Sequence, residues 1–260
     1  MPDTVETKTV HSQLLQILKA FDKVCRENGI RYSLHGGTLL GCIREKGFIP
    51  WDDDVDVSMT RAEYNKLAAA LKNNPTLEMD TLTNRFPQVW LKEKNADPVW
   101  LDIFIWDGIS EHRIARKLKI AILIFFLGFM KTRQTMRLST ERKKYKGMKH
   151  LVIYGTYLIG RLFPAKLKRR MATAAEQSFR GSGKDIHRSN DQYIGVVIVL
   201  PASVMSEYEY AVFEDTSLMI TKGYHEILKT CYGEDYMTPQ RSDEGDEASH
   251  KLAHEILHTR

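Results

Sequence analysis

Hydrophobic and polar positions follow two different periods along this chain, and the changes of period delimit the predicted elements. Apolar residues recur at helical spacing over 8–28, and Gly29 follows as a stop signal, so a long amphipathic helix is predicted there. Residues 31–37 predict a short strand that ends in two glycines, and 38–47 predict a helical turn or short helix.

Alternation then predicts three strands, over 54–59, 87–95 and 99–108. Between the first two, Thr60 followed by Glu63 forms a capping-box pattern at the start of a helix over 60–74. The order is helix, strand, helix, strand, helix, strand, strand. It predicts an α/β (α+β) domain, a mixed sheet flanked by helices, that ends near Gly108.

The middle of the chain has a different pattern, with apolar runs at 119–131 and 151–163 among basic segments. A basic helix is predicted from about Pro164, a buried strand over 193–200, then two short strands and a helix that stops at Gly233. The tail predicts a last helix over 247–260. We therefore expect a catalytic core over 1–108, a helical insertion over 109–190, and a C-terminal part over 191–260 that completes the same fold.

Composition narrows the class of protein only modestly. The chain has 260 residues, 43% of them hydrophobic and 27% charged, with a formal net charge of +5. Cys25, Cys42 and Cys231 lie far apart, which disfavours a zinc site of the usual spacing and is typical of a reducing compartment. The first residues lack a basic start followed by an apolar core, so no secretory signal is predicted and a cytoplasmic location is expected.

The stretch "GFIPWDDDVDVSM" places four aspartates, Asp52, Asp53, Asp54 and Asp56, within five positions. Alternate residues of a strand share a face, so Asp54 and Asp56 point one way and the valines between them point into the core. Two carboxylates about 7 Å apart can hold a hard cation, which offsets their repulsion. Asp102, an acid within an apolar strand, needs a partner, and a shared metal would supply it.

Upstream of the aspartates, Gly36 and Gly37 lie at a strand-to-helix junction. Glycines let backbone N–H groups approach an anion, and a helix N-terminus favours negative charge. Thr38 adds a hydroxyl at the same place. Together with the acids, this arrangement suits transfer of a phosphoryl or nucleotidyl group with Mg²⁺, or Mn²⁺ in its place.

The segment "GGTLLGCIREKGFIPWDDDVDVSM" resembles the signature of the LicD family, the phosphocholine transferases related to fukutin and fukutin-related protein. The match over 36–57 is nearly unbroken, and looser similarity extends to "DIFIWDG", "LPAS", "VFED" and "YGEDYMTP". The tail segment "PQRSDEGDEASHKLAHE" is more acidic than the family's usual pattern, so no role is assigned to His250 or Lys251. The resemblance implies a nucleotidyltransferase-like fold.

The resemblance also implies roles for particular residues: a glycine pair at Gly36–Gly37 and catalytic, metal-binding acids at Asp54, Asp56 and Asp102. The implied reaction moves a phosphoryl-alcohol group, phosphocholine above all, from a CDP-activated donor to a sugar hydroxyl, with release of CMP. The implied acceptor is a cell-surface glycan, a lipid-linked glycan or a teichoic acid precursor, and nucleic acid is not expected as a partner. Choline, ribitol, glycerol and ethanolamine stay open as the donor alcohol. A nucleotidyltransferase for small molecules and an inactive scaffold of the same fold are the alternatives.

Several further residues have two interpretations each. Asp52 and Asp53 either cap a turn or complete the metal shell, and we assign Asp52 to the metal. Arg44, Lys46 and Lys92 either contact the donor or lie on the solvated surface. Candidates for holding a quaternary ammonium are the four tryptophans, with Trp51 preferred because it adjoins the acids: Trp51, Trp90, Trp100 and Trp106. His35 is expected to be a near-core histidine.

The apolar run at 119–131 also has two interpretations. Its core is too short to span a bilayer, which takes about 20 residues. The cations on both sides permit peripheral membrane contact through 116–137, on the inner face of the membrane. The alternative is a buried helix that packs on the 151–163 run.

Overall fold

The structure is a computed structural model that describes residues 5–82, 85–93, 99–141 and 147–239. The helix predicted over 247–260, with His250 and Lys251, lies outside the described residues. The described helices are α1 (Val5–Glu27), α2 (Gly36–Arg44), α3 (Arg61–Leu71), α4 (Arg113–Phe129), α5 (Arg133–Glu141), α6 (Gly147–Gly160), α7 (Ala165–Glu176), α8 (Tyr193–Val197), α9 (Tyr224–Tyr232) and the 3-10 helix η1 (Ala202–Met205).

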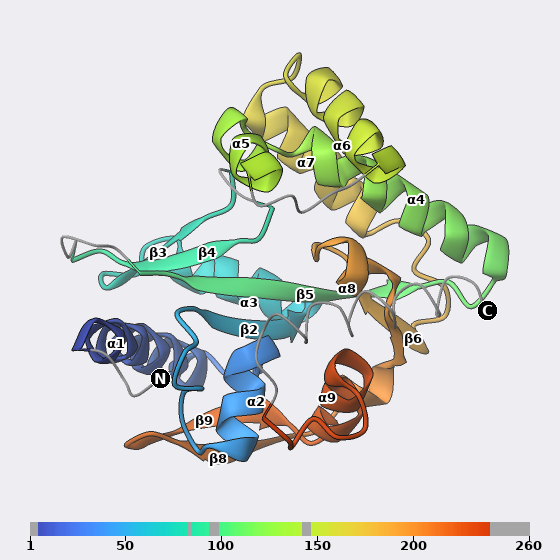
Figure 1. Ribbon diagram of the computed structural model, residues 1–260. Helices are drawn as coiled ribbons and strands as arrows, with labels where there is room; N and C mark the ends of the chain where they lie inside the picture. Colours follow the sequence, from blue (N-terminus) through green and yellow to red (C-terminus); the bar gives the residue numbers. More distant parts are fainter. Residues whose placement is uncertain (1–4, 83–84, 94–98, 142–146, 240–260) are drawn as a thin grey trace.

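The described strands form one mixed sheet and one separate hairpin (Figure 1). They are β1 (Ser33–Leu34), β2 (Val55–Thr60), β3 (Leu77–Asp80), β4 (Gln88–Leu91), β5 (Leu101–Ile109), β6 (Asp185–Arg188), β7 (Val199–Pro201), β8 (Tyr208–Phe213) and β9 (Thr216–Thr221). The order β1-β2-β5-β4-β3 is extended by β6 on β5 and β7 on β6, while β8 and β9 make the hairpin. Only β2 and β5 pair in parallel among the described strands. The predicted α+β class is confirmed.

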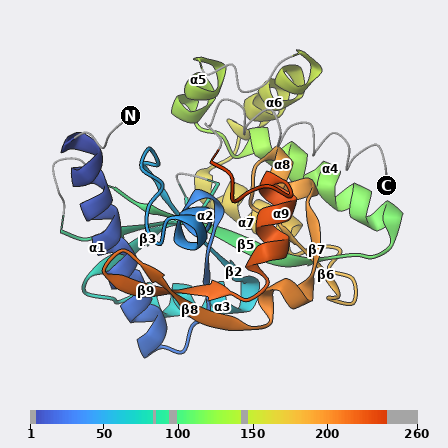
Figure 2. The ribbon, with the colours of Figure 1, turned by 60° about the horizontal axis from the view of Figure 1, so that its bottom comes forward.

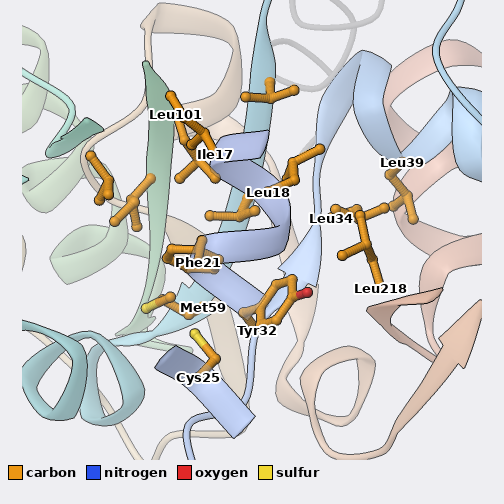
Figure 3. Close-up of a cluster of buried hydrophobic side chains, with 14 of the residues drawn as sticks. Ile17, Leu18, Phe21, Cys25, Tyr32, Leu34, Leu39, Met59, Leu101 and Leu218 are labelled. Carbon is orange, nitrogen blue, oxygen red and sulfur yellow. The ribbon is translucent and has the colours of Figure 1, made fainter. Parts of the chain in front are cut away.

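The main core lies between the sheet and α1, and Figure 3 shows part of it. The helical stripe of α1 buries Ile17, Leu18 and Phe21 completely. On β2, Val55, Val57 and Met59 face the same core, as the alternation predicted. The strand is therefore fixed in register by its apolar side, which turns Asp56 to the opposite face.

The local caps explain why two of the predicted elements start and stop where they do. The Thr60 hydroxyl accepts a hydrogen bond from the Glu63 N–H at 3.4 Å at the start of α3. The Glu63 carboxylate does not complete the capping box. It accepts from the Arg31 N–H at 3.1 Å and from the Arg31 guanidinium. At the other end of the chain, α9 stops at Gly233, which has a φ of 95°.

Two elements differ from the sequence prediction. The run 193–200 was predicted as one buried strand, but it forms the short helix α8 followed by β7, because a continuous apolar run does not distinguish a helix from a strand. Strand β3 was not predicted at all. It has four residues and pairs only with β4, so its pattern is too short to stand out.

Helices α4 to α7 form a helical unit that lies between β5 and β6 in the chain and at the top of Figure 1. The apolar run of α4 is buried within it: Leu123, Phe126, Leu127 and Phe129 pack against α6, α7 and α8. The burial of the apolar run supports the buried-helix interpretation, and peripheral membrane contact through 116–137 stays a prediction. Among the described helices, none is long and apolar enough to cross a membrane.

One buried ion-pair network joins the helical unit to the sheet. The Arg61 guanidinium, at the start of α3, pairs with Asp107 of β5 and with Glu176 of α7, the latter at 2.9 Å. The Ser189 hydroxyl also donates to Asp107. The network fixes the end of α7 against the strands that carry the acids.

The helical unit also depends on a close approach of α4 and α6 at Gly128. A Cβ on this residue would overlap with Thr156 Oγ1 and with the Ile153 carbonyl oxygen. We expect Gly128→Val to lower the free energy of unfolding by about 1–3 kcal/mol, because the two helices must separate. Urea unfolding followed by circular dichroism measures this change.

Gly155, on α6, is the matched control for that substitution. No heavy atom lies within 4 Å of a Cβ built there. Gly155→Ala should therefore raise the free energy of unfolding by about 0.5–1 kcal/mol through helix propensity. Equal destabilisation by both variants would show that the α4–α6 contact is not closely packed.

Candidate active site

The predicted acids meet where β2 and β5 run side by side. Asp56 and Asp102 are direct partners in the parallel register. Their backbones are therefore about 4.8 Å apart and their side chains share one face. Asp54 immediately precedes β2, and Asp52 lies two residues further back in the loop. The structure thus brings together the acids that are widely separated in the sequence.

The acids share one electrostatic environment. Burial raises the pKa of Asp56 well above its ordinary value, and the charges of Asp54 and Asp102 raise it further. Burial likewise raises the pKa of Asp102 to about 6 and that of Asp52 to about 7. The neighbouring Asp54 contributes to both of these shifts. Removal of one carboxylate therefore relieves the others.

The donor set fits a hard divalent cation. Carboxylate oxygens are the ligands that Mg²⁺ prefers, and no Lys, Arg or His side chain in the described part of the chain forms an ion pair with Asp52, Asp54, Asp56 or Asp102. Within the same residues, no three His, Cys, Asp or Glu side chains are already arranged as a metal-binding group. The carboxylates lie on the same face, but their oxygen atoms do not converge on one metal position.

The glycine pair makes room for these carboxylates at the N-terminus of α2. Gly36 has a φ of 53°, and a Cβ there would lie 2.9 Å from Asp56 Oδ2. A Cβ on Gly37 would overlap with Asp52 Oδ2. The absence of side chains therefore lets two acids approach the start of the helix, where backbone N–H groups are free to bind an anion.

The Thr38 hydroxyl lies in the same junction, where it contacts the protein backbone. It accepts a hydrogen bond from the Asp56 N–H at 3.0 Å, and the His35 N–H donates to the Asp56 carbonyl at 2.9 Å. Thr38 is buried. It therefore fixes the position of Asp56 from the opposite side of the junction.

The structure does not bring the basic donor-binding candidates to the acids. Arg44 and Lys46 lie at the C-terminal end of α2, about 12 Å along the helix from Gly36. Arg44 donates to Glu45 at 2.6 Å, and Lys46 Nζ donates to the Ile43 carbonyl at 3.2 Å. Lys92 follows β4, and its ammonium donates to the Asn74 carbonyl at 2.6 Å. Their contact with the donor stays a prediction.

The four tryptophans have different surroundings. Trp51 is half-exposed beside Asp52, and Trp106 is buried in a second hydrophobic cluster. Trp100 is half-exposed and close enough to the Asp102 carboxylate to lower its pKa, and its ring centroid lies 5.3 Å from that of Trp90. Trp100, rather than the preferred Trp51, is the tryptophan in contact with a predicted catalytic acid.

Sequence analysis missed two residues that contact the acids or the glycine pair. The Gln88 side chain, on β4, donates from Nε2 to Asp102 Oδ1 at 2.8 Å. The Tyr232 hydroxyl, at the end of α9, would lie 3.8 Å from a Cβ on Gly36. Burial raises the pKa of Tyr232, and the charges of Asp56 and Asp52 add to the effect. The "YGEDY" motif marked the position of Tyr232, whereas a single glutamine in a strand gives no signal.

A buried arginine, Arg188, contacts His35, the residue that precedes the glycine pair. The Arg188 guanidinium, on β6, pairs with Asp191 at 2.8 Å and donates to His35 Nε2 at 2.7 Å. Because a guanidinium only donates, His35 accepts at Nε2, and burial beside Arg188 holds its pKa well below the ordinary value. His35 is a buried, neutral histidine, as expected. Arg188 lies in a segment whose sequence pattern indicated no role.

The hydrogen bond from Gln88 makes a specific prediction about Asp102. Gln88→Met keeps the size of the side chain and removes the donor, so Asp102 loses the group that orients it. We expect the affinity for Mg²⁺, or the activity, to fall by roughly 10–100-fold. Isothermal calorimetry with Mg²⁺ measures the affinity. Lys92→Met, next to the other end of β4, is the control for the Mg²⁺ affinity, and an equal loss of that affinity there would contradict a role specific to Gln88.

The site has the arrangement of a nucleotidyltransferase domain. A glycine pair begins a helix, an acid pair lies at the start of a strand, and a third acid lies on the neighbouring parallel strand. Comparison with known families agrees: the model described as "LicD/FKTN/FKRP, nucleotidyltransferase domain" matches residues 29–150. Residues 29–150 therefore match the nucleotidyltransferase domain of the LicD family. The match includes the glycine pair and all the predicted acids, and it ends within the helical unit.

Two relatives extend the comparison. The chain is 28% identical over 256 residues to "Lipopolysaccharide cholinephosphotransferase LicD" of Haemophilus influenzae, which covers 88% of this chain and 91% of that protein. It is also 41% identical over 109 residues to an uncharacterized protein of Rickettsia prowazekii, which covers 38% of this chain and 41% of that protein. The first similarity runs through nearly the whole chain, including the parts outside residues 29–150.

Proposed function

We propose that this protein is a Mg²⁺-dependent transferase that moves phosphocholine from CDP-choline to a sugar hydroxyl of a cell-surface glycan precursor, with release of CMP. The observation that carries the proposal is the pairing of Asp56 with Asp102 beside Gly36–Gly37, inside a LicD-family domain. The name of the Haemophilus relative, a lipopolysaccharide cholinephosphotransferase, supports choline and a glycan acceptor.

Asp52, Asp54, Asp56 and Asp102 are the residues that would hold the cation. When bound, Mg²⁺ (or Mn²⁺) neutralises the phosphates of the donor and polarises the bond to the leaving CMP. The N-terminal N–H groups of α2 would bind a phosphate oxygen, because Gly36 and Gly37 leave the backbone uncovered there. The position of Asp56 is fixed for this task by Thr38.

Asp102 is the proposed general base. It takes the proton of the acceptor hydroxyl while the sugar oxygen bonds to the phosphorus that carries choline. The bond from this phosphorus to CMP breaks, and CMP keeps the bridging oxygen. Without the cation, burial raises the pKa of Asp102 to about 6, and a raised pKa favours proton uptake by a carboxylate. Gln88 holds one of its oxygens, which orients the other.

The choline group requires an aromatic surface near the acids. Quaternary ammonium groups bind to tryptophan faces by cation–π attraction. Trp100 meets this requirement, since it is half-exposed, close enough to Asp102 to lower the pKa of its carboxyl, and adjacent to Trp90. Trp51, beside Asp52, would bind the choline group if the donor entered the site from the side of the loop that carries Asp52.

A panel of donors tests the proposal. The purified protein is incubated with CDP-choline, CDP-ribitol, CDP-glycerol, CDP-ethanolamine or ATP, with Mg²⁺ or with EDTA, and with and without lipopolysaccharide or teichoic acid precursors. We expect CMP release from CDP-choline that requires Mg²⁺ and increases with a glycan acceptor. Turnover of ATP alone would favour a nucleotidyltransferase for small molecules, and turnover of no donor would favour an inactive scaffold.

A further inference from the structure

Helix α6 carries an apolar stripe on the face that points away from the protein. Met148 is 74% exposed and Leu151 is 65% exposed, and the stripe ends at Leu162, which is 81% exposed. The outer stripe consists of side chains at helical spacing that are all exposed: Met148, Leu151, Val152, Leu158, Ile159 and Leu162. Exposed apolar patches of this kind mark interaction sites on soluble proteins.

The outer stripe is not the side of α6 that packs into the protein, because a different side of this helix is buried. Ile153 and Tyr157 are buried in a cluster with Leu127 of α4. A Cβ on Gly160 would overlap with the Phe129 carbonyl oxygen, so the two helices touch at that point. The orientation of α6 is thus fixed by its contacts with α4, and the side chains of the outer stripe are exposed to solvent. Figures 1 and 2 show α6 on the outer side of the helical unit.

The charges around the outer stripe have one sign. Between His112 and Ala175 the sequence contains a single acidic residue, Glu141, among many lysines and arginines. Exposed cations follow the stripe directly at Arg161, Lys166 and Arg170. In α7, the exposed apolar residues Leu167 and Met171 alternate with these cations. A partner that binds this surface must therefore provide both an apolar environment for the stripe and negative charge for the cations.

We propose that the outer stripe and its flanking cations dock the protein on the surface of an anionic phospholipid membrane. α6 has 14 residues and is about 21 Å long, which is short of the ~30 Å hydrocarbon core. It suits a helix that lies in the interface with its apolar side among the acyl chains and its cations among the headgroups. A second copy of this chain would bring two basic surfaces together, and nucleic acid offers no apolar phase for the stripe.

Vesicle flotation tests this docking surface. The full chain is mixed with phosphatidylcholine vesicles that contain phosphatidylglycerol, or with pure phosphatidylcholine vesicles, at low and high salt. We expect flotation with the anionic vesicles, weakened by salt, and at least about tenfold weaker binding to the neutral ones. The variant Leu151→Glu/Leu162→Glu should lose anionic binding by about tenfold or more, since both residues are exposed and their replacement leaves the core intact.

Val212→Glu is the matched control. Val212 is 58% exposed on β8, at the opposite end of the protein from α6 (Figure 1), so this variant should float like the wild type. Circular dichroism confirms that each variant is folded, and CMP release with a soluble acceptor should be unchanged in all of them. The docking proposal therefore fails or succeeds independently of the proposed function.

Any of three results would overturn the docking proposal. The wild type does not float with anionic vesicles, the Leu151→Glu/Leu162→Glu variant floats as well as the wild type, or the wild type binds neutral vesicles as strongly as anionic ones. Light scattering supplies a further outcome: a dimer that the double variant disperses, without vesicle binding, would assign the outer stripe to self-association. Retention on RNA in place of vesicles would assign the cations to nucleic acid.

Discussion

Replacing Asp56 with asparagine is expected to reduce CMP release from CDP-choline by on the order of 10³-fold or more, because the site loses a carboxylate that would hold the cation. Asp54→Asn should have an effect of the same size. Without Mg²⁺ at neutral pH, the free energy of unfolding of Asp56→Asn should equal or exceed that of the wild type, by about 1 kcal/mol. The reason is that burial and neighbouring carboxylates disfavour a charge at this position.

Asp53→Asn is the matched control for these two variants. Asp53 is exposed in the same loop, as Asp54 is, but it is not among the four carboxylates assigned to the cation, so its replacement should change CMP release by less than about tenfold. Thermal melting with and without Mg²⁺ completes the comparison. Wild-type CMP release in Asp54→Asn or Asp56→Asn would refute the metal assignment, and a large loss in Asp53→Asn would mean that the loop as a whole is required.

Replacing Asp102 with asparagine should separate transfer from donor binding. If Asp102 is the base, the change costs about 10²–10⁴ in rate, while Gly36–Gly37 and the remaining acids still bind CDP-choline. Calorimetry measures the donor affinity and a CMP assay measures transfer in the same preparation. We expect the donor affinity of Asp102→Asn to stay within about tenfold of that of the wild type.

Asp54→Asn gives the contrasting pattern, since a residue that only holds the cation should lose donor affinity and transfer together. If Asp102→Asn shows the same joint loss, Asp102 is a metal ligand only and the base lies elsewhere. Tyr232 is then the residue to examine, because its hydroxyl lies beside Gly36. Tyr232→Phe removes that hydroxyl without changing the packing of the ring.

The local pattern was sufficient to predict the parts of the fold that one segment determines. The stripe of α1, the alternation of β2 and the Thr60 cap depend on neighbours within a few residues, and each forms as expected. The pairing of Asp56 with Asp102 was also predictable, since an unpartnered acid in an apolar strand requires compensation.

The remaining features of the site depend on contacts between distant segments. Gln88 reaches Asp102 because β4 pairs with β5, and Tyr232 reaches Gly36 because α9 returns to α2. The pattern of residues within one segment does not specify contacts between segments that are distant in the sequence. The same limit explains why Trp51 was preferred to Trp100: nearness in sequence to the acids was visible, whereas the influence of Trp100 on the Asp102 carboxyl was not.

The apolar run of α4 illustrates a different limit. Its composition fits a membrane-contacting helix and a core helix equally well, and only its packing against α6 decides between them. Exposed apolar side chains are more numerous on α6, whose sequence is apolar on both sides, than on α4, where Ile114 and Leu118 are exposed. Hydropathy therefore located the apolar region of the chain but did not show which of its side chains are exposed.

The helical unit leaves the sheet after Ile109 and rejoins it at Asp185, and these two residues are register partners on β5 and β6. Its entrance and exit are therefore adjacent, as the ends of a hairpin would be. A segment attached in this way can be lengthened, shortened or exchanged without rerouting the strands that hold the acids. The proposed docking surface and the proposed active site therefore lie in segments that can evolve separately, and a chimera could combine one helical unit with another sheet.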